Sequence, residues 1–419
     1  MHPELLAQVL SVGEQLSRVW EIFKFLVRYA PYWGPPVLAV GFWRMWLRYV
    51  RARFIADQEY VLLELRLPAE VQKSPQAMQA VFDGLFLKSG ESTFIDRIWL
   101  GKVRMWYSFE IASHEGRVHM YVWIRSAFRR FFERTVYAQY PEVEVVGVED
   151  YALTLPFSLD TYNVYGMDYG LAAPIGVPIK TYPEFHLDQT SAKEEQKIDP
   201  IAHLLEFAGS MGKGEHLWIQ ILARAHKKED VTFGFIRNRK SYDELVKEEM
   251  ARIRKNPEET IVFPDGGVGK TLSDRQKRRI EAMNRNSLVS TPWDVGIRAI
   301  YMAEHEKFDG ANVTGLGSMW QPFGSPGYNS IVPIGNRWQN KLDYPWQDFN
   351  GYRENKMKVR IVDAYRRRAW FHAPYEYPHH MMTSEELATL YHIPGAVVRT
   401  PTIERITSTR AQAPANLPV

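Results

Sequence analysis

The sequence predicts an α+β protein in which an N-terminal membrane-anchor helix precedes two ferredoxin-like units. Three observations support this fold class. Residues 29–43 carry no charge and are followed at once by closely spaced arginines. Residues 57–152 then alternate in the order strand, helix, strand, strand, helix, strand, which is the order of the split βαβ unit. Residues 153–382 repeat this order more loosely.

Composition limits the classes of function. A chain of 419 residues has room for two or three domains. It contains no cysteine, which excludes disulfides, thiol nucleophiles and cysteine metal sites. The net charge is +3, and much of the excess lies in the arginine-rich segment 44–53. The remainder is close to neutral, which argues against a nucleic-acid-binding surface as the main purpose of the protein.

Residues 1–56 form the predicted N-terminal segment, which begins with an amphipathic pattern over 1–18. Pro35 and Pro36 suit the first turn of a helix, so we expect a helix over 36–56. The uncharged run reaches the roughly 20 residues of a bilayer span only if the first arginines extend to the headgroups. The side chains expected to anchor this helix are aromatic, basic or helix-starting: Trp33, Pro36, Trp43, Arg44, Trp46, Arg48, Arg51 and Arg53.

The position of these arginines predicts the orientation of the anchor. Basic residues favour the cytoplasmic side, so everything after residue 56 is expected in the cytoplasm, at the inner membrane. The alternative is an amphipathic helix that lies on the membrane surface or docks on a partner.

The first ferredoxin-like unit is expected over 57–152. Segments in which apolar residues alternate, as in strands, and segments in which they recur at helical spacing are separated from each other by Pro, Gly and capping residues. The predicted elements are a strand at 60–67, a helix opened by Ser74 and Pro75, strands at 103–112 and 117–124, a helix at 127–139, and a strand at 143–148.

The second unit, 153–382, is expected to be a diverged repeat of the first. Its predicted elements are a strand at 159–171, a helix after Asp199 and Pro200, strands at 216–223 and 293–302, and a helix at 312–320. A polar insertion, 224–292, interrupts it with charged helices at 241–255 and 273–286.

The C-terminal part has less regular patterns. Residues 321–351 are turn-rich and aromatic, which favours an ordered loop, and the basic segment 356–371 is strand-like. A short helix is expected at 385–391, with Thr383 or Ser384 as its N-cap and Glu386 placed as in a capping box. Residues 383–419 form the terminal segment, which ends in an extended tail from residue 400.

The segment Gly266–Thr271 is similar to the end of a phosphate-binding loop, so Gly269, Lys270 and Thr271 are the nucleotide candidates. Pro264 stands where that loop has its first glycine, and no buried strand leads into it. A phosphate-binding loop needs that strand before it and a packed helix after it. We therefore interpret the segment as a glycine turn and expect no cofactor; a degenerate nucleotide-binding protein is the alternative function.

No catalytic constellation is recognisable, so the sequence predicts a non-enzyme. His379 and His380 are adjacent but lack further ligands at metal-binding spacing. The consecutive Arg366–Arg368 raise a second alternative, a nucleic-acid adaptor.

Four C-terminal motifs carry a family resemblance: Gln321–Ser330, Tyr344–Phe349, Thr383–Pro394 and Ala415–Pro418. Together they resemble an uncharacterised bacterial membrane-protein family linked to conjugation-type type IV secretion ATPases, and the resemblance covers essentially the whole chain. The pattern Glu-Leu-Ala-x-Leu-x-His-x-Pro at 386–394 is similar to the segment just before the ATPase core of secretion and HerA/FtsK-type motors.

This resemblance implies a partner rather than an activity, because the relatives carry their phosphate-binding loop in a motor domain that would begin where this chain stops. The implied function is a membrane-anchored, non-catalytic scaffold that docks a secretion or DNA-translocation ATPase. Membrane lipid and a second copy of the chain are further expected partners, and nucleic acid is expected only indirectly. The expected docking residues lie in the terminal segment: Glu386, Leu387, Leu390, His392, Pro394, Ile403 and Ile406. Alternatively, the short helix packs on its own second unit and buries Leu387 and Leu390.

Overall fold

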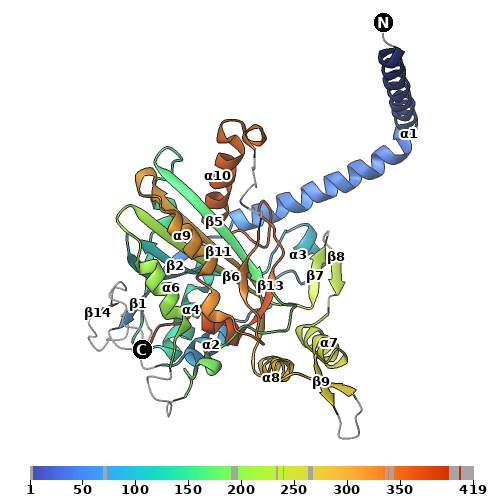
Figure 1. The fold of residues 1–419 in the computed structure, drawn as a ribbon. Helices are drawn as coiled ribbons and strands as arrows, with labels where there is room; N and C mark the ends of the chain where they lie inside the picture. Colours follow the sequence, from blue (N-terminus) through green and yellow to red (C-terminus); the bar gives the residue numbers. More distant parts are fainter. Residues whose placement is uncertain are drawn as a thin grey trace. The chain divides into compact units, whose positions relative to one another are not determined.

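One sheet organises most of the described residues, and its strands are mostly antiparallel (Figure 1). The computed structural model describes residues 3–68, 73–189, 197–232, 235–238, 240–262, 268–335, 338, 344–395 and 405–406. The chain divides into two compact units. Unit 1 comprises residues 1–56, 91–103 and 231–236, and unit 2 comprises residues 57–90, 104–230 and 237–419.

Unit 2 contains the sheet, which has ten strands in the described part of the chain. The strands are β1 (Tyr60–Pro68), β2 (Tyr107–His114), β3 (Arg117–Arg125), β4 (Glu144–Val148), β5 (Tyr162–Leu171), β6 (Glu215–Ala225), β11 (Pro292–Glu304), β12 (Ile331–Pro333), β13 (His380–Thr383) and β14 (Arg405–Ile406). Their order is β12-β5-β11-β6-β2-β3-β1-β14, with β13 beside β11 and β4 beside β1. Only the short β1–β14 pair is parallel among these described pairs.

The two halves of the sheet meet where β2 pairs with β6. This pairing is antiparallel and runs from Tyr107 opposite Ala223 to His114 opposite His216. Alternate residues of each strand point to opposite faces. The register therefore gives the joined sheet two continuous faces that differ in composition.

Helices cover the sheet on both of its faces. The helices of unit 2 outside the insertion are α2 (Pro75–Gly84), α4 (Arg129–Gln139), α5 (Tyr151–Thr154), α6 (Pro200–Gly209), α9 (Gly310–Ser318), α10 (Tyr352–Arg366) and α11 (Ser384–Leu390). Rings from α2 and from the end of α11 pack on Phe109 of β2, with centroids 4.8 Å away for Phe82 and 5.3 Å for Tyr391. The hydroxyl of Tyr169 in β5 donates to the Leu316 carbonyl of α9 at 2.8 Å. These contacts place the main hydrophobic core between the apolar face of the sheet and the helices α2, α4, α6, α9 and α11.

The opposite face is polar and is covered by α5, α10 and the segment after α10. Gln220 of β6 donates to the Tyr365 carbonyl at 3.2 Å, and Tyr151 of α5 donates to Glu110 of β2 at 2.8 Å. Ion pairs cross between neighbouring strands, since Arg298 lies opposite Asp168 and Arg224 lies opposite Asp294. All of these side chains are buried, so this face is a polar interior.

The predicted insertion is present as two helices and two short ribbons. These are α7 (Tyr242–Lys255), α8 (Asp274–Val289), the pair β7 (Glu229–Thr232) and β8 (Phe235–Asn238), and the pair β9 (Glu259–Val262) and β10 (Val268–Thr271). Ser241 and Ser273 accept backbone hydrogen bonds as N-caps of the two helices, each in a capping box. Short 3-10 turns complete the described elements: η1 (Ser126–Phe128), η2 (Tyr182–Phe185), η4 (His305–Lys307), η5 (Gln321–Phe323), η6 (Pro345–Gln347) and η7 (Phe349–Gly351).

Unit 1 contains one long helix, α1 (Pro3–Ala56), and the short α3 (Phe94–Ile98). The expected break before residue 36 is wrong, because the helix continues through Pro31, Pro35 and Pro36. Proline removes a helical hydrogen bond and bends a helix without always ending it. Figure 1 shows α1 changing direction along its length.

The predicted membrane-spanning helix is also wrong. Within the described residues, no helix has both the length and the apolar composition that crossing a bilayer requires. The reason lies in the sequence of α1, where Arg44, Arg48, Arg51 and Arg53 follow the uncharged run within about two turns.

The strands and helices predicted for residues 60–148 are confirmed, with boundary shifts of a few residues, as are β5, β6, β11, α6, α9 and the two insertion helices. Asp199 caps α6 as expected, and its side chain accepts from the Ile201 N–H. The strand predicted over 356–371 is wrong, because these residues largely form α10. Its buried side chains, Ile361, Val362 and Tyr365, recur at helical spacing.

Close packing on the polar face predicts the effect of one glycine substitution. A Cβ added at Gly296 of β11 would lie 2.2 Å from Cδ2 of the buried Trp370. We expect Gly296→Ala to lower the free energy of unfolding by about 1–3 kcal/mol, as overpacking does in other cores. The measurement is the urea midpoint of the full chain.

The matched control is Gly317→Ala in α9. The nearest atom to a Cβ there is 4.0 Å away, and alanine favours a helix over glycine by about 1 kcal/mol, so stability should stay equal or rise slightly. Equal urea midpoints for wild type and Gly296→Ala would show that Trp370 can move away.

Candidate functional site

The C-terminal part of α1 packs one of its faces within unit 1. Leu47 and Val50 are each 5 % exposed, and the Trp46 indole donates to the Ile98 carbonyl at 2.9 Å. Gly101 allows this close approach: its φ is +60°, and a Cβ there would lie 2.3 Å from the Val50 backbone. The α1 face that carries Trp46, Leu47 and Val50 is therefore already occupied.

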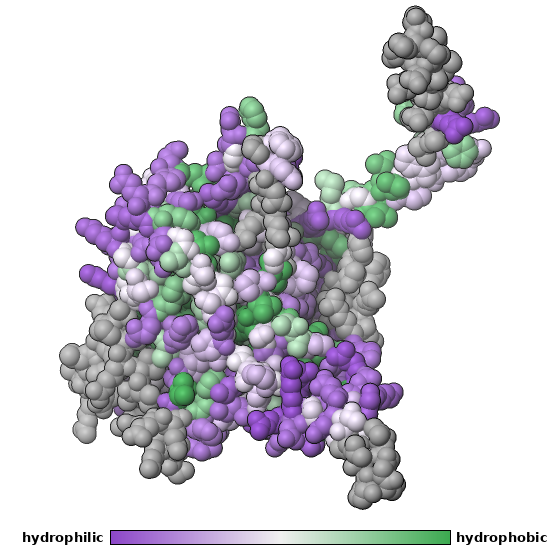
Figure 2. All heavy atoms as spheres, viewed as in Figure 1, coloured by the Kyte–Doolittle hydropathy of each residue, from purple (hydrophilic) through white to green (hydrophobic). Residues whose placement is uncertain are grey.

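A second face of α1 is apolar and exposed. Leu38, Phe42, Met45 and Tyr49 follow each other at intervals of four, three and four residues, which places them on one side of a helix. Their exposed fractions are 73 %, 67 %, 72 % and 58 %. We call these four residues the α1 stripe. Figure 2 shows hydrophobic residues along the described part of this helix.

Basic residues border the α1 stripe. Arg48 lies one turn after Met45, and Arg53 lies one turn after Tyr49. From residue 22 to residue 56 the chain has six basic residues and no Asp or Glu. An apolar stripe bordered by basic side chains fits an anionic surface with an apolar interior.

The predicted anchor residues differ in how far they are exposed to solvent. Trp46 contacts Ile98 and Trp99 inside unit 1, with a Trp46–Trp99 centroid distance of 5.6 Å. Trp43 and Arg51 are half-buried. The other predicted anchor residues are exposed: Trp33, Pro36, Arg44, Arg48 and Arg53.

The nucleotide candidates lie in a hairpin strand. Gly269, Lys270 and Thr271 belong to β10, where Lys270 pairs with Thr260 of β9. The next helix, α8, begins only at Asp274 and has its own cap, Ser273. In the described residues these three side chains therefore do not stand at the start of a helix that leaves a large sheet, as phosphate binding in this motif requires.

The arginines and histidines of the sequence motifs have intramolecular partners. Arg366 donates to the Leu155 carbonyl at 3.0 Å, Arg367 pairs with Asp363 at 2.8 Å, and Arg368 is 1 % exposed beside Glu110. His379 lies 3.4 Å from Asp294. Within the described part of the chain, no group of three or more His, Asp or Glu could hold a metal ion.

The predicted docking helix is an interior element. Thr383 caps α11, and Glu386 completes the capping box, as the sequence predicts. Leu387 and Leu390 are fully buried, as expected if the short helix packs on its own unit and does not face a partner. The helix α11 packs against α2, α6 and η2. A partner could reach these side chains only if α11 left its place.

Two further docking candidates, His392 and Pro394, are also buried. His392 is 1 % exposed, and its two ring nitrogens lie 2.9 Å from the Ala388 carbonyl and 3.1 Å from Asp199. Pro394 is buried. Ile406 lies in β14, opposite Pro68 of β1, while Ile403 lies outside the described residues.

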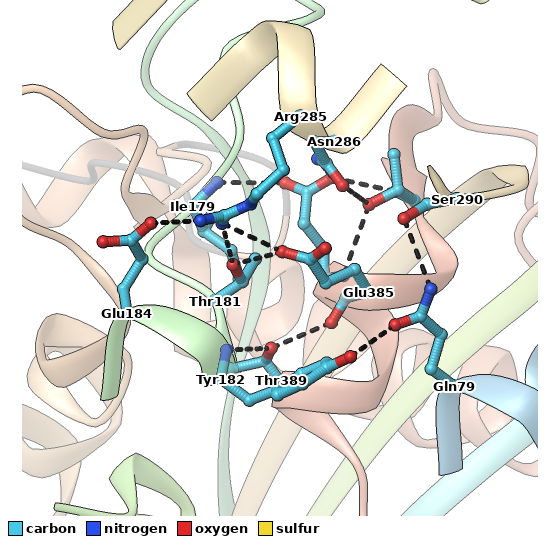
Figure 3. Close-up of polar contacts among 12 residues, drawn as sticks. Gln79, Ile179, Thr181, Tyr182, Glu184, Arg285, Asn286, Ser290, Glu385 and Thr389 are labelled. Carbon is cyan, nitrogen blue, oxygen red and sulfur yellow. Dashed lines mark hydrogen bonds and ion pairs between the residues drawn. The ribbon is translucent and has the colours of Figure 1, made fainter. Parts of the chain in front are cut away.

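The start of α11 is the centre of a buried polar network, which we call the α11 junction (Figure 3). Glu386 is 2 % exposed and accepts from the backbone N–H of Thr383 at 2.8 Å and of Ile179 at 3.0 Å. Asn286 of α8 donates to the same carboxylate at 3.4 Å and accepts from the Thr383 hydroxyl at 2.7 Å. One carboxylate thus joins α11, α8 and the segment before η2.

The second carboxylate of the junction, Glu385, is held by a cation and a hydroxyl. Arg285 of α8 donates to it at 3.2 Å, and Thr181 also donates to it. Arg285 further pairs with Glu184 of η2 at 2.5 Å. Figure 3 shows Arg285 between Glu184 and Glu385.

The junction extends to α2 through η2. The Tyr182 hydroxyl donates to Gln79 at 2.6 Å, and Gln79 donates to Ser290 at 3.4 Å. The sequence predicts the capping box but not the participation of Arg285, Thr181 and Gln79. No local signal marks them, since they lie roughly 100 to 300 positions from Glu385 along the chain.

Burial dominates the electrostatics of this junction. It raises the pKa of Glu386 to about 7, although the backbone N–H groups of Thr383 and Ile179 act in the opposite direction. The hydroxyls of Thr181 and Thr383 donate to the carboxylates of Glu385 and Glu386, so both carboxylates act as hydrogen-bond acceptors within the junction. The junction therefore holds α11, α8, α2 and η2 together through hydrogen bonds and ion pairs around two carboxylates.

Comparison with known proteins adds no assignment. No protein-family model matches the chain, and a search of curated proteins finds no similar sequence. The resemblance to secretion ATPase relatives therefore stays an expectation.

The α11 junction predicts a pH dependence of stability. Because the folded pKa of Glu386 lies above its unfolded value, the folded state binds the proton more tightly. The contribution of Glu386 to stability is full below about pH 4.5 and is lost as the pH rises through about 7. Relative to wild type, Glu386→Gln should therefore gain about 3 kcal/mol between these pH values, at 1.4 kcal/mol per pKa unit.

Urea unfolding of both proteins across this pH range measures the difference. The control is Glu206→Gln, which removes an exposed carboxylate of α6 that is not part of the α11 junction. A constant difference for Glu386→Gln would show that folding does not raise the pKa of Glu386.

Proposed function

We propose that this protein is a membrane-associated, non-catalytic scaffold that holds a secretion-type or DNA-translocation ATPase at the cytoplasmic face of the inner membrane. This proposal rests on the α1 stripe, which is exposed to solvent and has basic residues beside it. Under this proposal α1 lies on the bilayer surface and does not cross it, and the sheet of unit 2 serves as the platform.

The physical argument concerns the α1 stripe. Full burial of a Leu, Phe or Met side chain contributes about 1.5–3 kcal/mol. A basic residue close to an anionic surface adds about 1 kcal/mol. Partial burial of Leu38, Phe42 and Met45, together with a few arginines, therefore suffices for reversible attachment to anionic lipid.

We further infer that the platform consists of two ferredoxin-like units joined edge to edge. The strand order β4-β1-β3-β2 in the first half and β12-β5-β11-β6 in the second half supports this, since both are antiparallel. In each half the two helical crossovers lie on the same face. A fold of this kind does not by itself define an activity.

The ATPase part of the proposal rests on the resemblance of residues 383–394. Because α11 is buried, the contact with the motor is assigned to residues 396–419 instead of to Leu387 and Leu390. This assignment keeps the terminal segment as the docking element and leaves α11 as the part that holds it on unit 2.

The membrane proposal predicts a loss of binding when the α1 stripe becomes polar. We expect the triple variant Leu38→Gln, Phe42→Gln, Met45→Gln to bind vesicles containing phosphatidylglycerol at least about tenfold more weakly, equivalent to 1.4 kcal/mol. Glutamine keeps a high helix propensity, so α1 itself should persist. Co-sedimentation with vesicles at low and high salt measures both affinity and charge dependence.

The matched control replaces exposed leucines of unit 2, Leu153→Gln and Leu288→Gln, whose exposed fractions are 63 % and 78 %. This variant should bind as wild type does. Unchanged vesicle binding by the α1 triple variant would refute the membrane role of the stripe.

The docking proposal predicts that residues 396–419 recruit the motor. Removing them should abolish co-purification of an ATPase from membranes while the thermal midpoint stays close to that of the full chain. Retention of the ATPase by the shortened protein, or its unfolding at clearly lower temperature, would contradict this assignment.

A further inference from the structure

Unit 2 carries an exposed aromatic patch of its own. Tyr344, Trp346, Phe349 and Tyr352 lie in and around η6, η7 and the first turn of α10. Their exposed fractions are 52 %, 76 %, 83 % and 67 %. We call these four residues the aromatic tip. Single exposed apolar residues are common on protein surfaces, but four large rings within nine residues form a patch that calls for an explanation.

The backbone under the aromatic tip is held in place. The Asp348 carboxylate accepts from the N–H groups of Arg353 and Glu354 at 2.8 and 2.9 Å, at the start of α10. Asn350 and Gly351 turn the chain with φ of +53° and +67°. The rings of Tyr344 and Trp346 stack at 4.7 Å. The exposure of these rings is therefore part of a defined local structure.

The other end of α10 fixes the aromatic tip to unit 2. Ile361, Val362, Ala364 and Tyr365 are buried, and Tyr365 hydrogen-bonds Tyr151 at 2.7 Å on the polar face of the sheet. Because α10 is anchored at its C-terminal end, η7 and the first turn of α10 present Phe349 and Tyr352 to solvent. In Figure 1, α10 projects from the sheet with this end outward.

The charge around the aromatic tip is positive. Residues 344–360 contain four basic and two acidic side chains, a net charge of +2. One of the acids, Asp348, accepts from the backbone of α10, and the other, Glu354, pairs with Lys358 at 2.6 Å. Arg353 and Lys356 are exposed beside the rings.

This combination points to a lipid surface. Tryptophan and tyrosine favour the membrane–water interface, phenylalanine favours the apolar layer below it, and nearby basic residues favour anionic headgroups. A platform for single-stranded nucleic acid would need a basic groove along which successive bases stack. The aromatic tip is instead a short projecting turn with two acidic residues, which fits insertion better than a groove.

We propose that the aromatic tip is a second membrane-contact site, which inserts Trp346 and Phe349 into the interface of an anionic bilayer. This proposal deepens the proposed membrane association and rests on it, but it depends on residues of unit 2 and not on the α1 stripe.

The absence of cysteine from the chain allows a direct test. Phe349→Cys in the full chain is labelled with an environment-sensitive nitrobenzoxadiazole group, and its fluorescence is followed on addition of phosphatidylcholine vesicles with or without phosphatidylglycerol. We expect a blue shift and an increase in intensity with the anionic vesicles only. The control is Leu288→Cys on α8, equally exposed at 78 %, which should show no change.

A second variant measures the contribution of the rings to affinity. Trp346→Ser, Phe349→Ser should weaken binding to anionic vesicles about tenfold, equivalent to 1.4 kcal/mol. Both side chains are exposed, so the urea midpoint should match that of wild type.

The outcomes separate the two proposals. If the full chain binds vesicles but the probe at 349 shows no shift, the aromatic tip is not a contact site, while the proposed function stands. If the full chain does not bind vesicles, both proposals fail. A shift produced by single-stranded DNA alone, or by raising the protein concentration without vesicles, would overturn the lipid assignment in favour of nucleic acid or of a second copy of the chain.

Discussion

The fold depends on one buried cation, Arg368, which lies between Glu110 and Asp150. Its guanidinium donates to both oxygens of Glu110 at 3.0 and 3.2 Å and also pairs with Asp150. The hydroxyls of Tyr151 and Tyr365 complete this cluster, and Trp106 donates to the Arg368 carbonyl at 3.1 Å. A buried ion pair adds little stability by itself, but removing one partner leaves an unpaired charge at a cost of about 3–5 kcal/mol. Arg368 therefore fixes where the chain after α10 must lie.

The rest of the polar face follows the same constraint. Asp168 and Arg298 are neighbours across β5 and β11, and Asp294 and Arg224 are neighbours across β11 and β6. Each charge is satisfied only in the native register, because a slip by one residue would turn every side chain to the other face. The apolar face would tolerate many arrangements of similar volume. The polar face thus specifies the register, and the apolar face supplies most of the hydrophobic burial.

How far the sequence predicts this structure depends on the range of each interaction. Period and capping residues identify β1, β6, β11 and the capping box of α11 because those signals are local. The segment 356–371 is misread as a strand because its basic residues hide the helical spacing of Ile361 and Tyr365. The ion pairs Arg368–Glu110 and Arg298–Asp168 join residues 258 and 130 positions apart, and no local pattern reports them. The exposure of the α1 stripe is equally hidden, since it depends on which face of α1 packs on residues 91–103.

The two candidate contact surfaces, the α1 stripe and the aromatic tip, are built in the same way. In the described part of unit 2 the apolar core residues pack on one another, the buried cations Arg224, Arg298 and Arg368 pair with carboxylates, and α11 packs against α2, α6 and η2. Among the described residues, contact with a partner is therefore expected from side chains that the fold holds outward on ordered backbone. The α1 stripe and the aromatic tip meet this condition in different ways. The first is one face of a long helix whose other face is occupied, and the second is a capped turn at the free end of α10. Both combine large apolar groups with a local excess of basic residues, which is the composition that an anionic bilayer attracts.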